Sequence, residues 1–249
     1  DRSTDQRWIL WDLAPEQVAA VLFPLGGITK AEVREVAREA GLPNWDKPDS
    51  QEICFVPPGE GPAGFIRREA EALGFSLPAH PAAVPGAVVR SDGTRLGGHD
   101  GTIGFTVGQR RGIGVAAREP LYVVGIRPRE GEVVVGESEE VLTREVPLRG
   151  VRLLVPREDR AFRVLGRIRS RHADVPALLE LDGEPTDGRA RGRLLFDEPV
   201  RAAAPGQAAV LYAPERPELL LGGGRIAAHA GEAGTPGLDL RGCAAVRTV

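Results

Sequence analysis

Several residue types that carry chemistry are scarce or missing in this chain of 249 residues. It contains no methionine, two cysteines and four histidines, and its only lysines are Lys30 and Lys47. Two distant cysteines do not make a disulfide framework, and so few histidines argue against a zinc site. We therefore expect no metal site and a reducing, cytoplasmic setting. Without an initiating methionine, we expect that the sequence begins partway through a longer product or that its start was removed.

Long apolar runs and a strong net charge are also lacking. No run approaches the roughly 20 residues that span a bilayer, so we expect no membrane association. The net charge of −3 argues against a generally basic nucleic-acid binder. Nearly all the cations are arginines, whose planar fork suits phosphate groups and base edges. A genome-wide codon bias toward arginine, alanine and glycine is the simpler explanation for the bulk composition.

Helical signals dominate residues 1–75. A first segment opens at Pro15 and stops at Pro24. Thr29 and Glu32 form a capping box ahead of apolar residues at helical spacing, and Gly41 ends that helix. A loop rich in proline and glycine and a third short helix follow, over 45–64 and 65–73.

Strand signals dominate from about residue 84. Short β-branched runs alternate with turns, and the second series contains about six strands, which favours a small closed barrel. The fold class is therefore α+β and mostly β, with a tail over 229–249 that we expect to be disordered. The expected strands are 87–90, 102–107, 121–126 and 133–135, then 151–155, 162–168, 177–181, 193–196, 208–212 and 219–221.

An alternating segment over 162–172 is a candidate nucleic-acid contact. In a strand its apolar side chains would point one way and its arginines the other. Such a row of guanidinium groups suits a phosphate backbone. The alternative is a solvated strand face whose charges pair with Glu158 and Asp159. The arginines of the row are Arg163, Arg167, Arg169 and Arg171.

Three glycine-rich motifs are weaker candidates for functional sites. The word over 104–114 holds an arginine pair but not the phosphate-loop pattern, so a tight turn is the simpler reading. His99 and Asp100 are neighbours that would face opposite ways in a strand, so their spacing does not make a catalytic relay, and a turn explains them. Gly222-Gly223-Gly224 indicates a turn or a place where another element packs closely.

Cys54 follows a polar stretch over 49–52 and precedes a loop-like proline pair. We therefore expect one side of its thiol to face a cleft or solvent. The alternative is a half-buried structural cysteine at the edge of a loop.

Taken in order along the chain, these words resemble the tRNA-specific 2-thiouridylase family, which makes 2-thiouridine at the anticodon wobble position. The resemblance covers about residues 5–226. The matching words are Thr4-Asp5-Gln6, Leu22-Phe23-Pro24-Leu25-Gly26, Thr29-Lys30-Ala31-Glu32-Val33-Arg34, Asp49-Ser50-Gln51-Glu52-Ile53-Cys54-Phe55, Gly98-His99-Asp100-Gly101, Thr106-Val107-Gly108-Gln109-Arg110-Arg111-Gly112, Asp197-Glu198-Pro199-Val200, Pro205-Gly206-Gln207 and Leu221-Gly222-Gly223-Gly224.

The resemblance implies a chemistry. An N-terminal pyrophosphatase domain binds ATP and adenylates the C2 oxygen of the target uridine. Cys54 matches the catalytic cysteine that accepts sulfur as a persulfide from a relay protein or cysteine desulfurase; that sulfur displaces AMP. A second cysteine, in the N-terminal domain, then closes a disulfide. The residues that match contacts to the tRNA anticodon stem-loop are Thr4, Asp5, Gln6, Arg169, Ser170 and Gln207.

Departures from the family pattern define what we expect of this chain. Thr4, Glu52 and Ser170 stand where the family has lysine, glycine and an aromatic residue. The ATP loop and the partner cysteine have no match, so we expect the isolated chain neither to bind ATP at that site nor to thiolate tRNA. A non-catalytic RNA-binding remnant and a barrel for protein contacts are the alternatives. The expected domains are 1–75, the end of the ATP-pyrophosphatase domain with the cysteine loop; 76–148, a central β module; and 149–228, an RNA-binding barrel.

Overall fold

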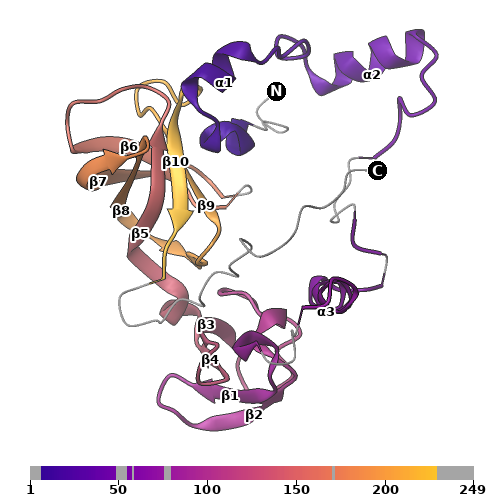
Figure 1. The fold of residues 1–249 in the computed structure, drawn as a ribbon, viewed down its shortest axis with the longest axis vertical. Coiled ribbons are helices and arrows are strands. Elements are labelled where there is room, and N and C mark those ends of the chain that lie inside the picture. Colours follow the sequence, from indigo (N-terminus) through magenta and orange to yellow (C-terminus); the bar gives the residue numbers. More distant parts are fainter. Residues whose placement is uncertain (1–6, 49–54, 58, 76–79, 170–171, 229–249) are drawn as a thin grey trace. The chain divides into compact units, whose positions relative to one another are not determined.

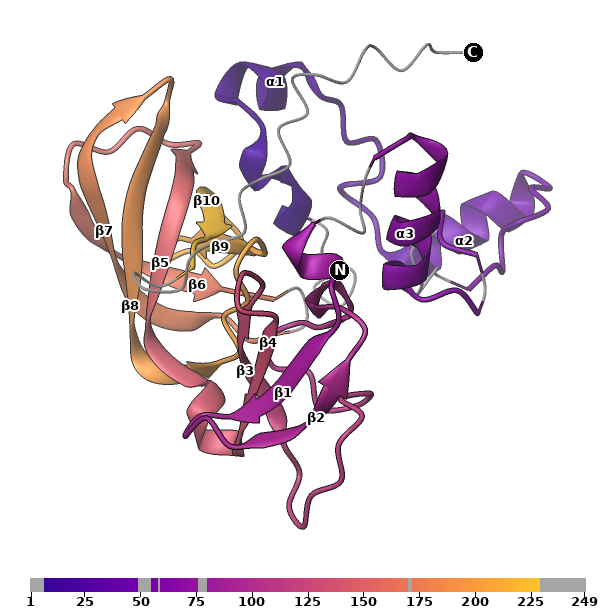
Figure 2. The same ribbon diagram turned by 60° about the horizontal axis from the view of Figure 1, so that its bottom comes forward.

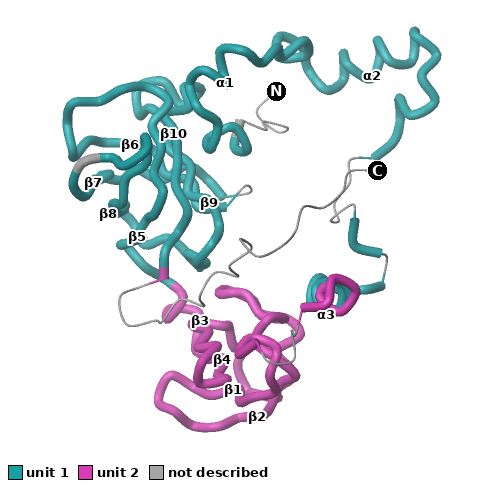
Figure 3. Tube along the Cα trace, in the orientation of Figure 1, with its two compact units in different colours: residues 1–69, 142–227 teal, residues 70–141, 228–249 magenta. Residues whose placement is uncertain are grey.

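The computed structural model describes residues 7–48, 55–57, 59–75, 80–169 and 172–228 (Figure 1). The chain divides into two compact units, which Figure 3 colours separately. Unit 1 combines Asp1–Glu69 with Leu142–Ala227, and unit 2 combines Ala70–Val141 with Ala228–Val249. Both contain a β-sheet and few helices, so the fold class is α+β and mostly β, as predicted.

The helices of the first part are short. They are the 3-10 helix η2 (Arg7–Asp12) and the α-helices α1 (Pro15–Ala20), α2 (Lys30–Glu39) and α3 (Pro62–Ala72). The capping box of α2 is confirmed: the Glu32 amide donates to Thr29 Oγ1 at 3.3 Å, and the Thr29 amide donates to Glu32 Oε2 at 2.6 Å. Gly41 ends the helix with φ at +68°. Neither α1 nor α2 contains a buried residue, so the apolar side chains of both helices stay at least partly exposed.

Unit 2 is built on a four-stranded sheet of order β2-β1-β4-β3, in which β1 and β4 run parallel. Its strands are β1 (Gly86–Arg90), β2 (Arg95–His99), β3 (Tyr122–Arg127) and β4 (Glu132–Gly136). Short 3-10 helices, η4 (Pro81–Ala83), η5 (Thr102–Gly104) and η6 (Ser138–Val141), lie at its connections. Valines fill the core, and Val88, Val123 and Val133 are fully buried.

The structure corrects the sequence-based elements of unit 2 in one region. The predicted strand over 102–107 is wrong: it begins as η5, where the Phe105 amide donates to the Thr102 carbonyl at 3.0 Å. The glycine-rich motif before it instead contributes Gly97, Gly98 and His99 to β2, which ends at His99. The buried His99 ring is satisfied locally, because Nδ1 accepts from the Gly101 amide at 2.9 Å and Nε2 lies 3.2 Å from the Gly131 carbonyl.

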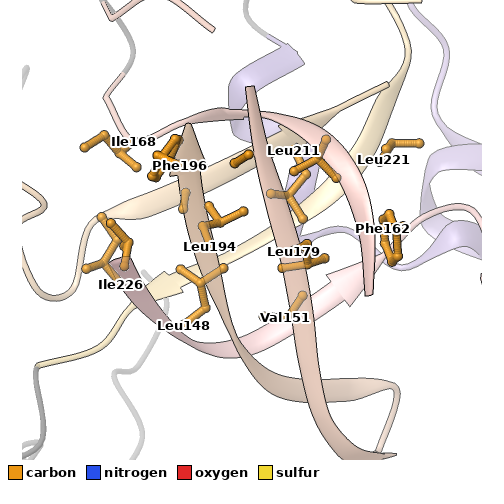
Figure 4. Close-up of a cluster of buried hydrophobic side chains, with 14 of the residues drawn as sticks. Leu148, Val151, Phe162, Ile168, Leu179, Leu194, Phe196, Leu211, Leu221 and Ile226 are labelled. Carbon is orange, nitrogen blue, oxygen red and sulfur yellow. The ribbon is translucent and has the colours of Figure 1, made fainter. Parts of the chain in front are cut away.

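Unit 1 contains the predicted closed barrel of six antiparallel strands, in the order β10-β5-β8-β7-β6-β9. Alternating side chains point inward and meet as one apolar core, labelled in part in Figure 4. Residues 151–153 of the strand predicted over 151–155 form the end of a longer β5, and residues 154–155 lie beyond it. The strands are β5 (Leu142–Leu153), β6 (Ala161–Arg167), β7 (Val175–Thr186), β8 (Arg189–Arg201), β9 (Ala208–Tyr212) and β10 (Leu220–Ile226).

Candidate nucleic-acid interface

Strand β6 has the predicted alternation of faces. Phe162 and Val164 are buried in the barrel core, while Arg163 is exposed on the outer face. The strand ends at Arg167, so the arginine row does not continue as a straight strand to Arg169. Arg171 lies outside the described residues.

The first two arginines of the row are held by carboxylates. Arg163 forms a bidentate pair with Asp197 on β8, with one Nη1–Oδ1 distance of 2.9 Å. This pairing lowers the pKa of Asp197. Arg167 donates to both oxygens of Asp174 at 2.7 and 2.9 Å. The pairing partners are therefore not the neighbouring acids that the sequence suggested, and a phosphate at these positions must compete with fixed carboxylates.

Arg169, the third arginine, contacts the barrel rim differently. Its Nη2 donates to the carbonyl of Ala202, just beyond β8, at 3.1 Å. Burial lowers the pKa of Arg169, although arginine stays protonated in proteins. Ala202 is buried with φ at +59°, a left-handed conformation that costs a non-glycine residue on the order of 1 kcal/mol. Arg169 thus contacts a residue of the β8–β9 connection whose backbone has a left-handed conformation.

Gln207 belongs to the same β8–β9 connection. The side chain is exposed, and its backbone is fixed by a turn, since the Gln207 amide donates to the Ala204 carbonyl at 3.2 Å. Ile226 of β10 holds the turn from the other side: its amide donates to Gln207 and its carbonyl accepts from Gly206, both at 2.8 Å. The structure therefore brings the predicted RNA-contacting residues Arg169 and Gln207 to one connection, residues 202–207.

The N-terminal segment η2 is attached to this side of the barrel. Trp11 is 4% exposed and packs with Val210 and Tyr212 of β9. A Cβ on Gly223 would lie 2.9 Å from the Trp11 ring, so the glycine word on β10 is a close-packing position. Asp12 accepts from Arg189 Nη2 at 2.6 Å, which fixes the end of η2 to β8.

Arg225 on β10 joins η2 to the turn that carries Gln207. Its Nη1 donates to the Gly206 carbonyl at 3.3 Å, and its Nη2 lies 3.9 Å from Asp12 Oδ2. Its guanidinium carbon lies 5.7 Å from the centre of the Trp11 ring. Arg225 is not among the site residues predicted from the sequence. Its outward position in a strand, directly after the glycine motif at 222–224, could have indicated it.

Several predicted site residues lie outside the described residues: Cys54, Thr4, Asp5, Gln6 and Ser170. The segment that leads from residues 4–6 into the described chain is η2, which makes its anchoring to the barrel relevant to the proposed interface.

Residues 7–48 do not fit a nucleotide-binding loop. Among them, α2 is the helix that follows a glycine pair, Gly26-Gly27. The carboxylate of Glu32 already lies at its start, and hydrogen bonds from Thr29 lower the pKa of Glu32. A phosphate there would meet this negative charge, so no step can be assigned to ATP on these residues.

In the described ranges, no three His, Cys, Asp or Glu side chains come together as metal ligands would. No helix in the part of the chain that the structure describes is long and apolar enough to cross a membrane.

Three family profiles match consecutive parts of the chain. The profile described as tRNA methyl transferase HUP domain matches residues 1–58, and that described as tRNA methyl transferase PRC-barrel domain matches residues 77–137. The profile described as Aminomethyltransferase beta-barrel domain matches residues 143–226, which contain all six strands of the closed barrel except the first residue of β5.

Curated relatives of high similarity carry a common name. The tRNA-specific 2-thiouridylase MnmA of Koribacter versatilis is 41% identical over 91% of this chain and 58% of its own length. That of Syntrophotalea carbinolica is 40% identical over 91% of this chain and 59% of its own length. The tRNA-specific 2-thiouridylase MnmA 2 of Syntrophus aciditrophicus is 39% identical over 91% of this chain and 67% of its own length.

The chain belongs to the tRNA-specific 2-thiouridylase family. It spans a little under three fifths of the length of the first two of these relatives. The names of the first two profiles and of the relatives differ in the group transferred but agree on tRNA.

Proposed function

We propose that this chain is the part of a tRNA-uridine 2-sulfurtransferase that accepts sulfur and binds tRNA. The observation that carries the proposal is the convergence of Arg169 and Gln207 on the β8–β9 connection, in a chain of the 2-thiouridylase family. Arg225 and Trp11 attach the segment next to residues 4–6 to the same barrel. The partners are the tRNA anticodon stem-loop and a sulfur relay protein or cysteine desulfurase, and the setting is the cytoplasm.

The proposed chemistry runs through Cys54. A donor transfers sulfane sulfur to the Cys54 thiolate, which gives a persulfide. The outer sulfur attacks C2 of a wobble uridine whose oxygen has been adenylated with ATP, and AMP leaves with that oxygen. A thiol from a second cysteine then attacks the Cys54 sulfur, which breaks the S–S bond to the new thiocarbonyl and leaves a disulfide. In this scheme the ATP site and the second cysteine belong to a HUP domain more complete than residues 7–48.

The apolar surface of the first segment supports an enzyme over a non-catalytic remnant. Leu22 is 86% exposed and Val36, on α2, is 59% exposed. A helix of ten residues such as α2 is marginal in water unless its apolar face is covered. A remnant gains nothing from keeping such a face, whereas the rest of a HUP domain would bury it. That residues 7–48 form no nucleotide site agrees with both readings, because the enzyme reading also assigns ATP to another segment.

The test is thiolation by the full-length gene product. We expect 2-thiouridine in tRNA after incubation with ATP, cysteine and a cysteine desulfurase, and none with Cys54→Ser. The isolated chain should bind tRNA without thiolating it. Turnover by the isolated chain would overturn our assignment of ATP to another segment. Salt-dependent tRNA binding by a full-length product that never thiolates would favour the remnant.

A further inference from the structure

The loop over 105–115 of unit 2 belongs to the connection between β2 and β3 (Figure 2), and hydrogen bonds hold it although it has no regular structure. The Gly108 amide donates to the Val123 carbonyl at 2.7 Å, and the Val123 amide donates to the Gln109 carbonyl at 2.9 Å, which ties the loop to β3. The Gln109 side chain bridges the loop internally, accepting from the Thr106 amide at 3.1 Å and donating to the Arg111 carbonyl at 2.9 Å.

Apolar residues anchor the second part of this loop. Ile113 is 6% exposed and belongs to the core of unit 2, with Val115 packed against the same core. A Cβ on Gly97 of β2 would lie 2.9 Å from a Val115 methyl group. Gly108 and Gly112 both have positive φ, which allows the chain to reverse sharply on either side of the arginine pair.

Arg110 and Arg111 lie between these two glycines, and both are exposed. Within the described ranges, neither guanidinium takes part in an ion pair or a side-chain hydrogen bond, in contrast to Arg163 and Arg167 on the barrel. Arg118, farther along the same connection, is also exposed. A rigid loop that holds two adjacent arginines in solvent is preorganised for an anionic ligand, because little further ordering is needed on binding.

We infer that the loop over 105–115 binds the phosphodiester backbone of tRNA, through Arg110 and Arg111. The inference rests on the proposed function, because a tRNA substrate supplies adjacent phosphates for the two arginines. The protein chain as a whole is slightly acidic. Arginine forks suit such phosphates, and a backbone contact carries no sequence requirement. The loop is therefore a positioning element for tRNA in unit 2, separate from the predicted contacts of the barrel.

The test compares two double variants of the full-length protein, whose titration with a tRNA transcript is followed at several salt concentrations. Arg110→Gln with Arg111→Gln removes the proposed contacts. Arg95→Gln with Arg127→Gln is the matched control, since it makes the same change in net charge on exposed residues of the same unit. Circular dichroism checks that both variants keep the wild-type fold.

We expect the loop variant to flatten the plot of log K against log salt by about 0.7–0.9 per lost contact, and to weaken binding up to about tenfold per arginine near 0.1 M salt. The control should follow the wild type. Equal behaviour of the two variants would overturn the inference while leaving the proposed function intact. Unchanged tRNA binding together with slower sulfur loading of Cys54 would assign the loop to the sulfur donor instead. A wild-type protein that does not bind tRNA would refute the proposed function and, with it, this inference.

Discussion

Replacing Arg225 tests whether one side chain joins the two predicted RNA-contacting parts of unit 1. Arg225→Ala removes the 3.3 Å hydrogen bond to Gly206, the ring contact with Trp11 and the longer approach to Asp12. A hydrogen bond contributes about 0.5–1.5 kcal/mol, an exposed cation–π contact about 0.5–1, and an exposed ion pair about 0–1. These terms are partly shared, so we expect a loss of about 1–2 kcal/mol in the free energy of unfolding.

The functional consequence should be a loss of position rather than of charge. Without Arg225, both η2 and the Gln207 turn keep their other contacts but lose the link between them. We therefore expect tRNA affinity to fall several-fold while the salt dependence of binding stays the same. Arg225→Lys keeps the charge but not the planar fork, so it should behave more like alanine than like the wild type.

Urea unfolding and tRNA titration at several salt concentrations measure these effects. Arg216→Ala is the control, because Arg216 is exposed, its side chain makes no hydrogen bond or ion pair with the described residues, and the change in charge is the same. The reasoning would be refuted if Arg225→Ala matched Arg216→Ala in both stability and affinity. A flatter salt slope in Arg225→Ala would instead assign Arg225 a direct phosphate contact.

Further predictions concern the same barrel. Asp197→Asn releases Arg163, so tRNA affinity should rise at low salt with a slope steeper by roughly one contact; unchanged titrations would exclude the β6 face from binding. Trp11→Ala should cost about 3–5 kcal/mol in unfolding free energy, measured with urea, because the ring is buried against β9 and β10; a loss below 1 kcal/mol would mean that η2 is not anchored as described. Burial, and secondarily the charge of Arg169, lowers the pKa of His172 below 6.5, so the unfolded chain binds the proton more tightly. The wild type should therefore lose stability relative to His172→Gln as pH falls through the unfolded value toward the folded one, and parallel pH profiles would contradict this.

Sequence patterns predicted the barrel because alternation is a local signal. In β6 every inward position is apolar or glycine, and this alternation survives in the structure. Strand ends were harder to predict. β5 begins at Leu142, within a charged and proline-bearing stretch whose pairing with β8 is not visible locally. In unit 2, the run over 102–107 has strand composition, but the left-handed Gly101 and the η5 turn break it.

The candidate site was predictable only in part, because its contacts join residues far apart in sequence. Asp197 pairs with Arg163 across 34 positions, whereas sequence reasoning turned to acids close by. The junction at Arg225 depends on Trp11 and Asp12, which come from the other end of the chain. Motif resemblance predicted Arg169 and Gln207 as RNA contacts, and the structure adds the β8–β9 connection, which Arg169 contacts and to which Gln207 belongs.

Mapping sulfane sulfur on the full-length protein tests the central claim most directly. The protein is incubated with a cysteine desulfurase and cysteine, its thiols are then alkylated, and its peptides are analysed by mass spectrometry. The account predicts a persulfide on the peptide that contains Cys54, and its disappearance in Cys54→Ser. Sulfane sulfur on Cys243 alone, or on neither cysteine, would contradict the account.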